Sequence, residues 1–268
     1  MTTSVARVPY LNSAPFFRGL PLGERYTITD CVPRELGERA ARGELIAGLL
    51  PVADYLRLED RFERLGPFGI AVRGRAHSVF LFSRKPIRQL DGGTIAVTAA
   101  PSTTGVLLRL LLEQRYHISP AAYDRVRVPT SADAARPAPE SDGRAGDALV
   151  LIGDEALTFR ERNREYPFEI DLAFEWWLWQ HLPFVFAVWA VRKDAVDEEK
   201  RELALALTKA LARNATQLEM IAEERAASLG LPAKELHAYL ASFIYRLSQP
   251  EEAGIARFRE LVHEHRLL

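Results

Sequence analysis

The opening stretch VARVPYLNSAPF combines a short apolar segment with polar side chains that lie between two prolines. The apolar run ends at Pro9, Asn12 and Ser13 follow, and Pro15 starts a segment with a helical pattern. A side-chain amide can orient a hydroxyl or a carboxylate, although it cannot act as a strong base. The stretch therefore predicts one wall of a ligand site. The alternative is an ordinary loop in which Asn12 or Ser13 caps the helix.

A second polar corner, APSTTG, follows the apolar segment TIAVTAA and precedes the helical pattern VLLRLLLEQ. Ser102, Thr103 and Thr104 stand where that helix begins, so hydroxyls, free backbone N–H groups and the positive end of the helix come together. This combination suits a carboxylate or a phosphate, and simple N-capping is the alternative. The chain contains neither GxxxxGK(S/T) nor GxGxxG, so a nucleotide phosphate is not expected.

The other titratable residues are isolated in the sequence. Asp154 ends the apolar segment LVLIGD, where it could act as a base or contact a ligand, although such an aspartate more often caps the next helix. His77 precedes another apolar segment, a position more typical of an exposed turn than of catalysis. His263 and His265 lack the i,i+4 spacing of a zinc-binding helix. Without a nucleophilic serine motif, a metal-binding set or a dense carboxylate pair, we expect no metal, no cofactor and little acid–base chemistry by side chains.

Composition and charge are those of an ordinary globular protein. The 268 residues are 48% hydrophobic and 26% charged, with a formal net charge of −1, which gives no reason to expect nucleic acid or a membrane as a partner. No apolar run approaches the ~18 residues of a membrane span, and no apolar signal segment starts the chain. The single cysteine, Cys31, cannot form an internal disulfide. We therefore expect a soluble cytoplasmic protein, of an oligomeric state that the sequence does not specify.

Short apolar segments alternate with helical patterns along most of the chain. Strands are expected in YTITDCVP, FGIAV, SVFLFS, TIAVTAA, YDRVRVP, ALVLIGD and LPFVFAVW, and a helix in VADYLRLEDRFERL. YTITDCVP alternates, whereas most of the others are apolar runs, and such runs favour a parallel sheet covered on both faces. The segment SADAARPAPESDGRAGD is expected to be an exposed loop. Residues 197–228 carry the apolar stripe of a helix, and two shorter helices follow from Pro232 and Pro250.

The strand–helix pattern starts again after Arg84 and returns near the end of LPFVFAVW, which predicts two α/β lobes. Residues 1–84 and 190–268 are expected to form the first lobe, with the C-terminal helices packed on it, and residues 85–189 the second. The two crossings would form a hinge, and the cleft between the lobes is the natural ligand site.

Ligands of open parallel sheets lie beyond the carboxyl ends of the strands. That rule selects the loops PYLNSAP, GLLPVAD, AAPSTTG and LIGDEAL and the turn that leads into HSVFLFS. The residues expected to bind a substrate there are Tyr10, Pro51, Ser102, Thr103, Thr104, Gly153 and Asp154.

Six blocks together resemble one known family. VPYLNSAPFFRGL, VPRELGERAARGELIAGLLPVADY, HSVFLFSRKP, APSTTGVLLRLLL, LIGDEAL and LPFVFAVWAVR occur in this order along nearly the whole chain. They are similar to the chorismate dehydratases of the futalosine route of menaquinone biosynthesis. The sister family, 1,4-dihydroxy-6-naphthoate synthase, shares the fold, but its first loop reads more like Ser-Pro-Cys-Pro-Asn-Asp, whereas this chain has PYLN.

The resemblance implies a two-lobed type II periplasmic-binding-protein-like fold and a lyase that converts chorismate to 3-(1-carboxyvinyloxy)benzoate. It points to Asn12 and Ser78 as the catalytic polar pair and gives the Ser/Thr corner a substrate carboxylate to hold. Loss of the C3 proton and the C4 hydroxyl makes an aromatic ring, so the protein has to supply orientation and a dry pocket with fixed dipoles. The base could be a side chain or a carboxylate of the substrate.

Two other functions stay open at this point. The chain could be the sister naphthoate synthase, or a non-catalytic binding protein for a small carboxylate, which would use the same fold and the same polar loops.

Overall fold

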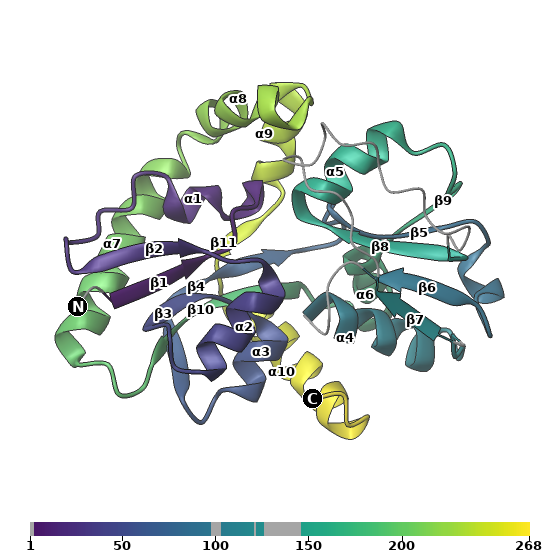
Figure 1. The fold of residues 1–268 in the computed structure, drawn as a ribbon, viewed down its shortest axis with the longest axis horizontal. Coiled ribbons are helices and arrows are strands. Elements are labelled where there is room, and N and C mark those ends of the chain that lie inside the picture. The colour runs from purple at the N-terminus through teal and green to yellow at the C-terminus, as the bar shows by residue number, and fades with distance from the viewer. Residues whose placement is uncertain (1–2, 98–102, 121, 126–145) are drawn as a thin grey trace.

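Two α/β lobes lie side by side in the structure, each built on its own β-sheet (Figure 1). The computed structural model describes residues 3–97, 103–120, 122–125 and 146–268. Ser102 and nearly all of the segment expected to be an exposed loop lie outside the described residues. The two-lobed α/β class expected from the sequence is confirmed.

The first lobe carries a six-stranded sheet with helices on both faces. Its strands are β1 (Thr3–Arg7), β2 (Tyr26–Asp30), β3 (Ala47–Pro51), β4 (Phe62–Val72), β10 (Phe184–Arg192) and β11 (Ile244–Arg246), in the order β11–β4–β10–β3–β1–β2. Its helices are η1 (Leu11–Ser13), α1 (Ala14–Phe17), α2 (Pro33–Ala41), α3 (Val52–Arg57), α7 (Asp197–Asn214), α8 (Leu218–Leu229), α9 (Ala233–Ala241) and α10 (Gln249–Glu264). Helices α1 and α7 lie on one face, and α2, α3 and α10 on the other (Figure 1).

The second lobe carries a five-stranded sheet. Its strands are β5 (Val79–Ser83), β6 (Thr94–Val97), β7 (Ala122–Arg125), β8 (Ala148–Ile152) and β9 (Phe168–Asp171), in the order β7–β6–β8–β5–β9. Its helices are η2 (Ile87–Gln89), α4 (Thr103–Leu110), which continues into the π-helical turn η3 (Leu111–Arg115), α5 (Gly153–Arg162) and α6 (Leu172–Gln180). Helices α4 and α6 lie on one face and α5 on the other (Figure 1).

Both sheets are mixed, so the expectation of parallel sheets is wrong in part. Strands β1, β2 and β3 run parallel, as do β6, β7 and β8. Strand β10 runs antiparallel to β3 and β4, and β5 runs antiparallel to β8 and β9. A strand buried on both faces is apolar throughout whichever way its neighbours run, and all five residues of β5 are buried. The apolar pattern therefore indicates burial and leaves strand direction open.

The chain crosses between the lobes at different residues from those expected. Within the described part of the chain, β5 pairs only with strands of the second sheet, and β10 pairs with strands of the first from Phe184 to Arg192. The first crossing thus lies between Val72 and Val79, and the return lies between Gln180 and Phe184. The two crossings are neighbours in space, because Phe184 is the register partner of Val72. The expected boundaries at 84/85 and 189/190 are corrected accordingly.

Two segments that carry a helical pattern differ from the expectation. Helix α3 ends at Arg57, and the following FERL starts the long strand β4. The stripe at 197–228 is divided between α7 and α8 at Asn214, whose buried side chain donates hydrogen bonds to the carbonyls of Pro15 (3.0 Å) and Arg18 (2.8 Å). The C-terminal helices pack on the first lobe as expected, α7 against α1 and α10 against β10. None of the described helices combines the length and the apolar character that a membrane span requires.

Asp54 of α3 is a buried carboxylate at a close approach of two helices. A Cβ atom at Gly37 of α2 would lie 2.7 Å from the Asp54 carboxylate, and the Arg57 guanidinium lies 2.9 Å from it. Burial raises the pKa of Asp54 to about 6, although the charge of Arg57 acts in the opposite direction. Ionisation of Asp54 in the folded protein therefore costs free energy.

Replacing this carboxylate should change how stability depends on pH. The pKa of Asp54 is higher in the folded protein than in the unfolded chain. The free energy of unfolding therefore falls as the pH rises from about 4 to about 6, and it recovers when the pH is lowered again. We expect the unfolding free energy of Asp54→Asn, relative to wild type, to rise by up to about 3 kcal/mol over that interval. Urea denaturation at about pH 4 and about pH 7 measures it. The exposed Asp60→Asn is the control, and a difference that is equal at both pH values would contradict the expectation.

Candidate active site

A cavity that is open to solvent at its mouth lies between the two lobes. Clefts between domains or lobes are a common place for small-molecule sites. The lining residues are Val8, Tyr10, Asn12, Ser13, Leu49, Pro51, Ile70, Phe186 and Ala187 of the first lobe and Val79, Thr103, Thr104, Ile152 and Gly153 of the second. Most of these are apolar, and the polar side chains among them come from the two corners that the sequence singled out.

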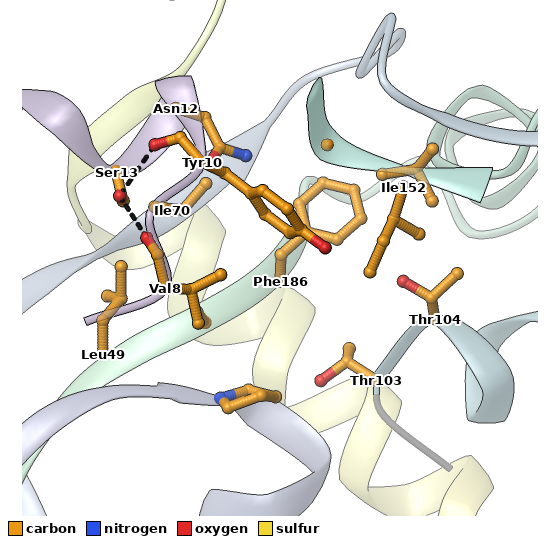
Figure 2. Close-up of a pocket in the computed structure, with 14 residues that line it drawn as sticks. Val8, Tyr10, Asn12, Ser13, Leu49, Ile70, Thr103, Thr104, Ile152 and Phe186 are labelled. Atoms are coloured by element: carbon orange, nitrogen blue, oxygen red, sulfur yellow. Dashed lines mark hydrogen bonds between the residues drawn. The ribbon is translucent and has the colours of Figure 1, made fainter. Parts of the chain in front are cut away.

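The loop after β1 is held in shape by Ser13. The Ser13 hydroxyl is buried and lies 2.6 Å from the carbonyl oxygen of Val8 and 2.8 Å from that of Tyr10 (Figure 2). Pro15 stands in the first turn of α1 and presets its backbone. Ser13 therefore organises the loop through backbone carbonyls, which leaves Asn12 as the side chain of this pair that is available to a ligand.

Asn12 and Tyr10 form one wall of the cavity. With the described residues, the Asn12 amide makes no hydrogen bond, although it lines the cavity and is only partly exposed. The Tyr10 ring extends from the loop toward the side where Thr103, Thr104 and Ile152 lie (Figure 2). Burial raises the pKa of Tyr10, and the charges of Glu155 and Asp154 act in the same direction. The phenol is thus a neutral hydrogen-bond donor at neutral pH.

Thr103 and Thr104 form the opposite wall, at the start of α4. Both are buried. The Thr103 hydroxyl oxygen accepts a hydrogen bond of 3.1 Å from the backbone N–H of Ala53, in the first turn of α3 in the other lobe. Among the described residues no acceptor takes the proton of this hydroxyl, so it can be donated into the cavity. Thr103 is therefore a cavity residue and a contact between the lobes at once.

Ser78, expected to be one of the catalytic pair, does not line the cavity in this structure. Its side chain is fully buried, and the Tyr239 hydroxyl of α9 donates a 2.8 Å hydrogen bond to it. Its backbone carbonyl accepts the N–H of Gly153 at 2.8 Å. The next residue in the sequence, Val79, does line the cavity.

Asp154, expected to bind the substrate, is also absent from the lining, although Gly153 belongs to it. One Asp154 oxygen accepts the backbone N–H of Leu11 at 2.8 Å, and the other lies 2.7 Å from the guanidinium of Arg225 on α8. Both partners belong to the first lobe. The structure thus engages this carboxylate with protein groups on both of its oxygens.

The structure brings together most of the residues that the sequence selected. Tyr10, Asn12, Pro51, Thr103, Thr104 and Gly153 line one cavity, and Ser102 lies outside the described residues. Nothing in the sequence marks Phe186, Ile70 and Ala187 as lining residues, because apolar strand residues look alike whether they line a cavity or fill a core. In the described part of the chain no group of three or more histidine, cysteine, aspartate and glutamate side chains is placed to hold a metal ion.

Comparisons with solved structures identify the fold. Protein AF1704 of Archaeoglobus fulgidus superposes with a TM-score of 0.78 at 18% identity, over 100% of this chain and 98% of that chain. The CA3427 gene product of Candida albicans, described as having the generic periplasmic-binding-protein fold, superposes with a TM-score of 0.68 at 12% identity, over 100% and 91% of the two chains. The expected periplasmic-binding-protein-like architecture is confirmed.

Comparisons of sequence go further. A chorismate dehydratase of Thermus thermophilus is 30% identical over 273 residues, which cover 94% of this chain and 92% of that protein. A family model described as menaquinone biosynthesis matches residues 3–264. This chain therefore belongs to the menaquinone-biosynthesis family.

Proposed function

We propose that this chain is a chorismate dehydratase, a lyase that converts chorismate to 3-(1-carboxyvinyloxy)benzoate. The observation that carries the proposal is the 30% identity to the Thermus thermophilus chorismate dehydratase over nearly the whole of both chains. The cavity supports it, since an apolar lining with a few hydroxyl and amide groups suits a compact apolar ring that bears carboxylates.

The reaction removes the proton from C3 and the hydroxyl from C4 of chorismate and leaves an aromatic ring and water. No aspartate, glutamate, histidine or lysine is found among the described residues that line the cavity. The proposal therefore assigns removal of the C3 proton to a carboxylate of chorismate itself, from which the proton passes to the departing C4 hydroxide, so that water is released. What the protein supplies is orientation and preorganised dipoles in a largely apolar pocket.

Three side chains have distinct parts in this proposal. The Asn12 amide has no hydrogen-bond partner in the described chain, so it can donate to the leaving hydroxyl without first breaking a bond. Thr103 and Thr104 stand at the positive end of α4, where hydroxyl donors and the helix end favour a carboxylate.

Ser78 stays in the proposal as the polar partner of Asn12, with a condition. Its hydroxyl accepts a hydrogen bond from Tyr239, and Ser78 is not among the residues that line the cavity. It would act on the substrate only if it exchanged the bond with Tyr239 for one with the ligand.

A direct assay tests the activity. Purified protein is mixed with chorismate, the ultraviolet spectrum is followed as the ring aromatises, and the product mass is determined. Loss of one water from chorismate with an aromatic spectrum supports the proposal. Tight binding of chorismate without turnover would instead make the chain a carboxylate-binding protein.

Asn12→Ala should abolish most of the turnover and leave the fold intact. Removing one well-placed dipole from a water-excluded site costs about 10²–10³-fold in rate. Because the amide makes no hydrogen bond with the described residues, we expect the melting temperature to stay close to that of wild type. Steady-state kinetics and thermal denaturation of the same preparation measure both effects.

Ser13→Ala is the matched control one residue further on. Its hydroxyl holds the loop through two backbone carbonyls, so its loss should lower stability by about 1 kcal/mol. An Asn12→Ala protein that melts early but turns over chorismate normally would make the loop structural only.

Thr104→Val should weaken binding without loosening the fold. The substitution keeps the shape and removes a hydroxyl that makes no hydrogen bond with the described residues. We expect a loss of roughly 1–3 kcal/mol in chorismate binding, the cost of removing a donor from a charged acceptor. Isothermal titration measures it, and Thr103→Val should add a loss of stability, since Ala53 then loses its acceptor. Unchanged affinity in both variants would make the corner a helix cap only.

A further inference from the structure

Asp154 links three elements of two lobes through one carboxylate. It belongs to α5 of the second lobe, while Leu11 of η1 and Arg225 of α8 belong to the first. The Asp154 side chain is 15% exposed and that of Arg225 is 33% exposed. The two contacts use different oxygens, so neither competes with the other.

The backbone N–H that Asp154 accepts lies between two cavity residues. Leu11 follows Tyr10 and precedes Asn12, and both of these line the cavity. Gly153, directly before Asp154, has φ +62°, and a Cβ atom there would lie 2.7 Å from the Tyr10 ring. On the second lobe, Gly153 and Asp154 therefore form the surface against which the loop with Tyr10, Leu11 and Asn12 packs closely.

We propose that Asp154 is a positioning residue, which holds the Leu11 backbone and thereby fixes the place of the Asn12 amide in the wall of the cavity. Arg225 fixes the orientation of the carboxylate from the other side. This inference rests on the proposed function, because it takes Asn12 to be the group that acts on the substrate.

The surroundings of Asp154 make its two partners necessary. Burial raises the pKa of Asp154, whereas the Leu11 N–H and Arg225 lower it. The groups that interact with it electrostatically are Arg225 of α8, Tyr10 of the loop, Tyr239 of α9 and Glu155 of its own helix. Arg225 is the cation in this group. Among the described residues it is therefore the ion-pair partner of the Asp154 carboxylate.

The test compares variants on both sides of the contact. Asp154→Ala removes the acceptor of the Leu11 N–H, and Arg225→Gln removes the cation. Asp154→Asn keeps an oxygen that can accept from Leu11 and loses the charge. The control is Glu224→Gln, the neighbour of Arg225, because Glu224 pairs with Arg18 inside the first lobe.

The first measurement is hydrogen–deuterium exchange of the Leu11 amide in the substrate-free protein. We expect it to exchange at least about 10-fold faster in Asp154→Ala than in wild type, to stay largely protected in Asp154→Asn, and to be unchanged in Glu224→Gln. Wild-type exchange in Asp154→Ala would overturn the proposal whether or not the protein acts on chorismate.

The second measurement separates kcat from KM for chorismate. A displaced Asn12 should lower kcat by up to about 100-fold, since small misplacements have effects of that size, and KM should change much less because the Thr103–Thr104 wall is intact. Asp154→Asn should recover most of kcat. Faster exchange at Leu11 with unchanged kcat would overturn the positioning role. If the wild type itself does not turn over chorismate, the exchange result still decides the contact, and the proposed function alone fails.

Discussion

The pairing of β4 with β10 is the interaction on which the rest of the structure depends. The chain leaves the first lobe after the end of β4 and returns to it at the start of β10. These two strands are antiparallel neighbours, and Phe184 is the register partner of Val72. Beside them Trp176, Phe184 and Phe258 pack edge to face, with ring centroids 5.3–6.1 Å apart, and one apolar core runs through both lobes. The lobes are thus joined by this strand pairing and by a shared apolar core, and two polar contacts, Asp154–Leu11 and Thr103–Ala53, connect them beside the cavity.

Apolar patterns in the sequence predict well which segments of this architecture are buried. They predict less well which strands pair with each other. The strand–helix alternation and the polar loops after apolar segments were sufficient for the two-lobed class and for six of the lining residues. The apolar run of β5 indicates that the strand is buried but not which sheet it joins. For this reason the first crossing between the lobes was expected after Arg84, whereas it lies before β5. The spacing of FERL suits a helix, yet the register of β4 against β10 takes it into the sheet.

Side-chain partners were beyond the reach of the sequence for a different reason. Asp154 contacts Leu11, which is 143 residues away, and Ser78 contacts Tyr239, which is 161 residues away. No local spacing encodes such pairs. From the sequence, Asp154 could be a base, a ligand contact or a helix cap, because each of these uses a free carboxylate. In the structure it accepts a backbone N–H, as a cap does, but the N–H belongs to the other lobe.

The contacts at Leu11 and Ala53 have the same form. In each, a side chain of the second lobe accepts a backbone N–H of the first, so the first lobe contributes groups that every non-proline residue carries. Thr103 differs from Asp154 in that it also lines the cavity. When its hydroxyl donates to a substrate carboxylate, the oxygen becomes a better acceptor, because hydrogen bonds in a chain polarise one another. Under the proposed function, a bound carboxylate would therefore strengthen the Ala53 contact and hold the lobes closed around the substrate while the ring aromatises.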